Sequence, residues 1–138
     1  MILFVCRGNM FRSPIAKAFF NYFAKGNVAA ESCGTWVRKE HNSGKTLFAI
    51  GSFNTLEYMS KQGFDLFHEK ARQITPDMVR RAEKVIVMAE RDTWPEYLRK
   101  SQKVVVWHIK NPDTFSATEA SRIGNQIKSK VLELARRI

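Results

Sequence analysis

Residues 2–14 constrain the fold of this chain more than any other stretch. Four consecutive apolar residues, 2–5, predict a short buried strand, and Cys6 stands where that apolar run ends. Gly8-Asn9 follows, and these two residue types adopt the positive φ angles of tight loops most readily. Ser13-Pro14 then predicts a helix start, with the serine as N-cap and the proline as first helical residue. We therefore expect a strand, a tight loop and a helix.

The chemistry of this loop suits a phosphate group. Apolar residues continue after the proline at helical spacing, which supports the predicted helix: Ile15, Ala18, Phe19, Tyr22 and Phe23. Loop amides beside a helix N-terminus form a concavity of N–H donors for an anion. Arg12 adds a planar fork that can hold two phosphate oxygens, and the same field stabilises Cys6 as a nucleophilic thiolate. A buried cysteine beside a surface arginine is the simpler alternative, but the flanking strand and helix favour the phosphate site.

Residues 6–14 resemble the phosphate-binding loop of the low-molecular-weight protein tyrosine phosphatases. That family shares its fold with thioredoxin-coupled arsenate reductases. The resemblance continues through four shorter motifs and so covers nearly the whole chain: 32–35, 63–65, 71–75 and 85–89. Only the loop motif is specific, because the others are short and mainly architectural.

The resemblance implies a metal-independent phosphomonoesterase without a cofactor, acting on phosphorylated proteins or small aryl phosphates. Cys6 would be the nucleophile that forms a phosphocysteine, and Arg12 would bind the phosphoryl oxygens. Ser13 could donate a hydrogen bond to the thiolate and Asn9 could brace the loop, although capping and turn formation explain both residues equally well. The phosphate-binding residues implied are Arg7, Gly8, Asn9, Met10, Phe11, Arg12 and Ser13. Met10 replaces the threonine of arginine-phosphate-specific relatives, which favours aryl phosphate.

The general acid is where this chain departs from the family. The family protonates the leaving oxygen from the aspartate of an Asp-Pro pair, and Asn111 occupies that position here. An asparagine cannot donate this proton, whereas Asp113, two residues on, could do so or could merely cap a turn. Trp36 and Phe115 are candidate aromatic walls for a phosphotyrosine ring, with simple packing as the alternative.

Two other functions remain possible. A pseudophosphatase would bind phosphoprotein through the same loop after losing turnover together with its acid. An arsenate reductase would need further thiols to relay electrons, and residues 34–138 contain no cysteine. The phosphatase is therefore the leading hypothesis.

Cys6 and Cys33 are the two cysteines of the chain, and they give neither a disulfide framework nor a metal-ligand spacing. Both are expected at the ends of strands that the resemblance makes neighbours. Cys33 could therefore form a protective disulfide with an oxidised Cys6, although a small buried cysteine that merely packs is the favoured explanation.

The chain has a formal net charge of +10, which favours anionic partners. Its basic residues are dispersed and accompany no nucleic-acid-binding motif, so a phosphorylated substrate is favoured over nucleic acid. No apolar run reaches the length of a membrane span, and the first five residues are too few for the apolar region of a signal peptide. We therefore expect a cytoplasmic protein without membrane contact.

The remaining pattern alternates strands with helices. Further strands are expected over 28–33, 84–89 and 104–109. Helices are expected over 46–62, after Thr75, over 91–101 with a fresh start near Trp94-Pro95, and at the C-terminus. This order predicts a single α/β domain over 1–138, with three layers around a parallel sheet of four strands. The resemblance implies the strand order 2-1-3-4.

Overall fold

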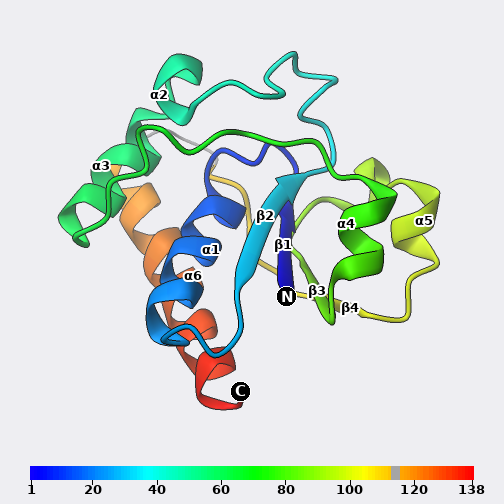
Figure 1. Ribbon diagram of the computed structural model, residues 1–138. Coiled ribbons are helices and arrows are strands. Elements are labelled where there is room, and N and C mark those ends of the chain that lie inside the picture. The colour runs from blue at the N-terminus through cyan, green and yellow to red at the C-terminus, as the bar shows by residue number, and fades with distance from the viewer. Residues whose placement is uncertain (113–115) are drawn as a thin grey trace.

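The computed structural model describes residues 1–112 and 116–138 (Figure 1). A parallel sheet has the order β2-β1-β3-β4, as expected. Its strands are β1 (Ile2–Cys6), β2 (Ala30–Gly34), β3 (Lys84–Val87) and β4 (Val104–Val106). The helices are α1 (Arg12–Phe23), α2 (Leu47–Ile50), α3 (Phe53–Lys61), α4 (Pro76–Arg81), the 3₁₀ turn η1 (Arg91–Thr93), α5 (Glu96–Arg99) and α6 (Ala117–Arg136).

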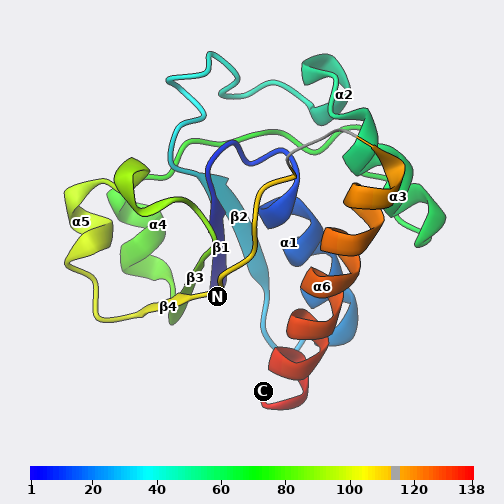
Figure 2. The same ribbon diagram turned by 180° about the vertical axis from the view of Figure 1, so that it is seen from behind.

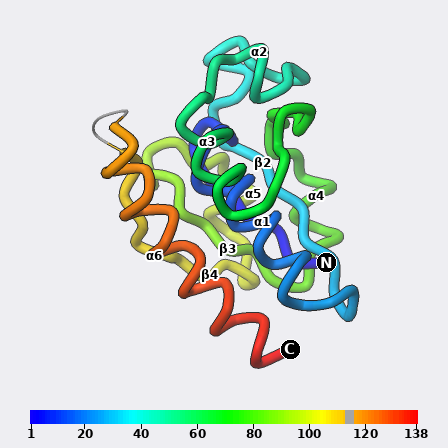
Figure 3. Tube along the Cα trace, turned by 90° about the vertical axis from the view of Figure 1, so that its left-hand side faces the viewer, coloured from blue at the N-terminus to red at the C-terminus, as the bar shows by residue number. Residues whose placement is uncertain are grey.

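Helices cover both faces of the sheet, which confirms the three-layer prediction. Figures 1 and 2 show α1 and α6 on one side, with α4 and α5 on the other. Figure 3 shows α6 running beside α1 toward the C-terminus. Side chains alternate between the two faces of β1, so Phe4 and Cys6 pack toward α1 and α6, whereas Leu3 and Val5 pack toward α4 and α5.

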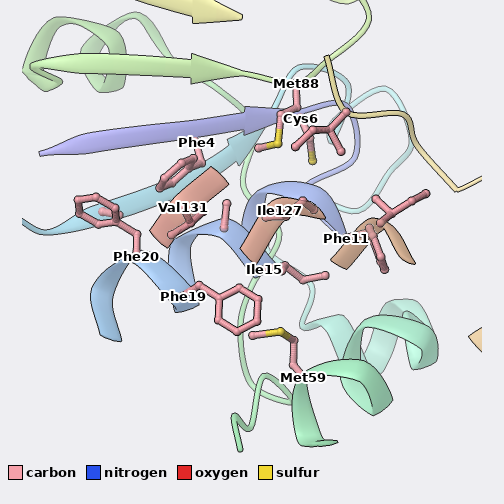
Figure 4. Packing of buried hydrophobic residues seen from close by; sticks show 14 of the residues in the cluster. Phe4, Cys6, Phe11, Ile15, Phe19, Phe20, Met59, Met88, Ile127 and Val131 are labelled. Atoms are coloured by element: carbon pink, nitrogen blue, oxygen red, sulfur yellow. The ribbon is translucent and has the colours of Figure 1, made fainter. Parts of the chain in front are cut away.

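The larger core lies between the sheet and the helices α1, α3 and α6 (Figure 4). Phe4 and Phe20 meet edge to face, with ring centroids 5.9 Å apart. Ile127 and Val131 of α6 are fully buried against this layer. Burial of each such side chain contributes roughly 1.5–3 kcal/mol. This packing holds β1 and α1 rigidly, and the loop between them is therefore held at both ends.

Several element boundaries differ from the sequence prediction. The helix expected over 46–62 is broken at Gly51, whose φ of +87° ends α2 before α3 begins. The helix expected over 91–101, with a fresh start near Trp94-Pro95, is η1 followed by the short helix α5, and Pro95 lies between them as expected. The second strand spans Ala30–Gly34 instead of 28–33, and the third and fourth strands end at Val87 and Val106, earlier than expected. The segments after the third and fourth strands supply the carbonyls of Met88 and Ile109 to Arg12.

No helix within residues 1–112 and 116–138 has the length and apolar character that a membrane span requires.

Candidate active site

Cys6 ends β1 with its side chain buried, and its sulfur receives polar contacts from the loop that follows. The backbone N–H of Asn9 donates to Sγ at 3.2 Å. The hydroxyl of Ser13 lies 3.0 Å from the same sulfur. The sulfur therefore lies at the start of the loop with a backbone N–H donor directed at it, a position that suits a nucleophile.

Asn9 braces the loop and also supplies its tight turn. Its φ is +53°, a conformation that asparagine tolerates better than most residues. Its side-chain amide donates to the hydroxyls of Ser13, at 2.7 Å, and Ser32, at 3.0 Å. Its amide oxygen accepts the backbone N–H of Arg72 at 2.8 Å. The two interpretations left open for Asn9 therefore both hold.

Ser13 is not the N-cap of α1, contrary to the sequence prediction. The cap position belongs to Phe11, the helix begins at Arg12, and Pro14 is its third residue. The hydroxyl of Ser13 is committed elsewhere, since it contacts Cys6 and also donates to the carbonyl of Cys33 at 3.2 Å. Pro14 still lies in the first turn, where a missing N–H leaves no bond unmade.

Arg12 is 1% exposed and is fixed by acceptors from distant parts of the chain. Its Nη1 and Nη2 donate to the two carboxylate oxygens of Glu90 at 3.2 and 3.1 Å. Nη1 also donates to the carbonyls of Met88 and Ile109. Nε has no hydrogen-bond partner among the described residues, 1–112 and 116–138. One edge of the guanidinium is therefore held by protein, while the edge carrying Nε–H and the second Nη2–H remains available to an anion.

Gly34 closes β2 directly behind this loop, and the loop needs a glycine there. A Cβ at Gly34 would lie 2.6 Å from the carbonyl oxygen of Arg7 and 2.9 Å from the backbone nitrogen of Asn9. The sequence pattern gives no sign that the loop backbone passes against this glycine.

A cavity of about 610 Å³ opens above the loop. Cys6, Gly8 and Phe11 line it from the end of β1 and the loop that follows, and residues 50–55, which we call the cavity wall, line it from the α2–α3 segment. The other described residues that line it are Arg7, Met10, Glu40, Asn42, Asn111 and Pro112. Thr55 ties the wall to the loop, because its hydroxyl donates to the carbonyl of Met10 at 2.6 Å. A pocket of this size is ample for a small organic ligand.

Comparison with known proteins matches residues 1–138 to the family model "Low molecular weight phosphotyrosine protein phosphatase". The chain belongs to this family. The match to the "Probable low molecular weight protein-tyrosine-phosphatase EpsP" of Ralstonia solanacearum is 31% identical over 87 residues, 63% of this chain. That match spans 54% of the EpsP chain, so about half of that relative's length is covered.

Two solved structures show the same fold as this member of the phosphatase family. The low molecular weight protein tyrosine phosphatase from T. tengcongensis is 21% identical, with a TM-score of 0.84 over 99% of this chain and 98% of its own. Vibrio vulnificus Wzb, solved in complex with benzylphosphonate, is 19% identical, with a TM-score of 0.82 over 99% of this chain and 97% of its own.

The remaining predicted site residues do not all line the cavity. The guanidinium carbon of Arg7 lies 4.5 Å from the centre of the Trp36 ring, and Nζ of Lys39 lies 4.4 Å from it. Trp36 is not among the described residues that line the cavity. Asn111 does line it. Asp113 and Phe115 lie outside the described residues, so their roles stay predictions.

Glu40 is a cavity residue that the sequence analysis missed. It is the one carboxyl among the described residues that line the cavity. Its Oε2 lies 3.7 Å from Nε of Arg7. Its Oε1 is buried, and no described residue forms a hydrogen bond with it. No sequence pattern marks Glu40, because it sits in an irregular basic loop far from the motif.

No group of three or more His, Cys, Asp or Glu side chains within residues 1–112 and 116–138 is placed to hold a metal ion.

Proposed function

We propose that this chain hydrolyses aryl phosphate monoesters, phosphotyrosine in proteins above all, through a phosphocysteine on Cys6. The observation that carries this proposal is the sulfur of Cys6, which is held under the cavity by the N–H of Asn9 and the hydroxyl of Ser13. Family membership and the free edge of Arg12 support it. Met10 lines the cavity with an apolar side chain, which suits an aryl group.

The reaction has two steps. The thiolate attacks phosphorus, the bond to the leaving oxygen breaks, and that oxygen takes up a proton. Water then attacks the phosphocysteine, releases inorganic phosphate and restores the thiolate. Loop amides and Arg12 would hold the equatorial oxygens throughout, and this positioning supplies most of the catalysis. Asp113 is our candidate for the proton donor, since Asn111 cannot fill that role.

The test is burst kinetics with p-nitrophenyl phosphate. Wild type should release a burst of nitrophenolate, whereas Cys6→Ser should show neither burst nor turnover and still bind phosphate or vanadate. Cys33→Ala is the matched control and should retain the burst. Turnover of Cys6→Ser above about 1% of wild type would exclude Cys6 as nucleophile. Arg12→Lys should weaken both binding and rate, because an ammonium lacks the planar fork.

A phosphate-binding pseudophosphatase is the second candidate, and Asn111 at the cavity favours it. In that case wild type would bind vanadate but would release no burst of nitrophenolate.

A further inference from the structure

Three exposed phenylalanines, Phe48, Phe53 and Phe67, form one surface cluster, which we call the aromatic patch. Their exposed fractions are 55%, 60% and 41%. The rings of Phe48 and Phe67 stack with centroids 5.5 Å apart, and those of Phe48 and Phe53 meet edge to face at 6.1 Å. Scattered exposed apolar residues need no explanation, but a contiguous group of large ones marks an interaction site.

The break between α2 and α3 creates this patch. Phe48 and Phe53 are five residues apart, so a continuous helix would turn them about 140° away from each other. The left-handed conformation of Gly51 ends α2 and brings the two rings into contact. The backbone N–H of Phe48 donates to the carbonyl of Phe67 at 3.4 Å and joins the third ring to the pair. The local irregularity therefore produces an ordered aromatic surface.

The aromatic patch is continuous with the active-site cavity. Phe53 belongs to both, since it lies in the cavity wall of residues 50–55 and contacts Phe48. Figures 1 and 3 show α2 and α3 at the same end of the molecule as the loop after β1. A chain whose phosphorylated residue enters the cavity would therefore pass over Phe48 and Phe67.

We infer that the aromatic patch binds an apolar or aromatic side chain that flanks the phosphotyrosine of a protein substrate. This inference rests on the proposed function and names the substrate class. Aromatic surfaces suit such side chains because ring contacts add to the burial of apolar area. The patch extends from the cavity, so the occupant is a residue close to the phosphotyrosine in sequence. The substrate is then a phosphotyrosyl segment with hydrophobic neighbours.

The experiment measures kcat/KM for two enzymes, each with two peptides. One phosphotyrosyl peptide carries leucines on both sides of the phosphotyrosine, and the other carries glycines there. The enzymes are wild type and Phe48→Ser/Phe67→Ser, which leaves Phe53 and the cavity wall intact. Wild type should favour the leucine peptide about tenfold in kcat/KM, a preference that needs one well-formed apolar contact. The double variant should lose this preference and keep its rate on p-nitrophenyl phosphate.

Tyr22→Ser is the matched control, because Tyr22 is 65% exposed and lies near the far end of α1 from the active-site loop. It should keep the preference for leucine. Should the double variant fail to fold, Phe67→Ser alone carries the test. Equal kcat/KM values of wild type for the two peptides would overturn the inference, as would a preference that survives in the patch variants.

Binding separates this inference from the proposed function. Fluorescence polarisation with Cys6→Ser measures affinity for the same peptides without turnover. A leucine preference in binding that the patch substitutions remove would support the inference even if wild type proved inactive. Sedimentation equilibrium covers the other occupant, a second copy of this chain. A dimer that the substitutions dissociate, with peptide preference unchanged, would overturn the inference.

Discussion

Glu90 contacts Arg12 through both of its carboxylate oxygens, and these two residues lie 78 positions apart in the chain. Glu90 follows β3, whereas Arg12 opens α1. The contact fixes the end of the guanidinium, so its other edge is oriented before any ligand arrives. Glu90 is therefore a positioning residue for Arg12.

Glu90→Gln should reduce kcat for p-nitrophenyl phosphate about tenfold or more, because small displacements of a positioning group slow catalysis steeply. An amide presents one acceptor oxygen instead of two and carries no charge, so the guanidinium gains freedom to turn. Glu96→Gln, an exposed residue paired with Lys100, is the matched control. Steady-state kinetics at neutral pH checks this. A Glu90→Gln enzyme with wild-type kcat would show that Arg12 keeps its orientation without Glu90.

Glu90 should also make stability depend on pH. Burial raises the pKa of Glu90, but the hydrogen bonds and charge of Arg12 outweigh burial and hold the pKa below its ordinary value of 4.5. A lowered folded-state pKa stabilises the fold above the unfolded-state pKa, and this contribution disappears as pH falls through the folded-state pKa. The unfolding free energies of wild type and Glu90→Gln should therefore differ at pH 7 and converge below pH 4.5. A constant difference in urea titrations would contradict the assignment.

Cys33 and Cys6 lie on neighbouring strands but on opposite faces of the sheet. The register pairs Val5 with Cys33 and Cys6 with Gly34, so the two cysteines are offset by one residue. Cys6 packs toward α1 and α6, while Cys33 packs toward α4 and α5. Burial, followed by the charges of Cys6 and Glu31, raises the pKa of the Cys33 thiol. The geometry argues against the protective disulfide and equally against a thiol relay for arsenate reduction.

Peroxide should therefore oxidise Cys6 at the same rate in wild type and in Cys33→Ala. Mass spectrometry of unreduced peptides would follow the sulfonic acid at Cys6. A linked Cys6–Cys33 peptide in wild type, or faster overoxidation of Cys6 in Cys33→Ala, would contradict the offset between the two strands.

The first strand, the loop that follows it and the strand order of the sheet could be predicted, because each depends on the local sequence pattern or on the family resemblance. The face of the sheet on which the Cys33 side chain lies could not be predicted. A shift of one residue in the strand register moves the side chain to the opposite face but leaves the sequence pattern unchanged. The cavity wall was missed for a related reason. Apolar residues continue every third position through Gly51, so the periodicity indicates one helix where the backbone makes two.

Glu90 could have been identified from the sequence as a candidate site residue. It follows the third predicted strand, and ligand sites in parallel sheets gather at the carboxyl ends of strands. A charged residue there is a reasonable partner for Arg12. Glu40 offers no such signal, because its place beside the loop depends on the irregular path of residues 36–45.

Gly124→Ala should destabilise the fold. A Cβ at Gly124 of α6 would lie 2.4 Å from the ring of Tyr58, which is buried and donates its hydroxyl to Asn125 at 2.7 Å. Overpacking typically costs about 1–3 kcal/mol, which exceeds the gain in helix propensity of about 1 kcal/mol. Urea denaturation should show a lower midpoint, whereas the exposed neighbour variant Gln126→Ala should not. A midpoint equal to wild type would mean that the ring moves aside freely.

Two substrates whose leaving groups differ in their need for a proton should identify the residue that donates it. Asp113→Asn should slow phenyl phosphate by 10²-fold or more, the scale of general acid catalysis, because phenolate leaves poorly without a proton. The same variant should affect p-nitrophenyl phosphate far less, since nitrophenolate needs little protonation.

Two further variants, Asn111→Asp and Glu40→Gln, should be measured on the same two substrates, because both residues line the cavity. If Asp113 is the donor, Glu40→Gln should leave the ratio of the two substrates unchanged. A loss confined to phenyl phosphate in Glu40→Gln would transfer the role to Glu40, whose Oε1 is buried without a partner in the part of the chain that the structure describes. If Asp113→Asn has no effect and Asn111→Asp accelerates phenyl phosphate, the natural chain has no acid. The phosphate-binding interpretation then gains, because the proton is the one element of the reaction that the loop itself cannot supply.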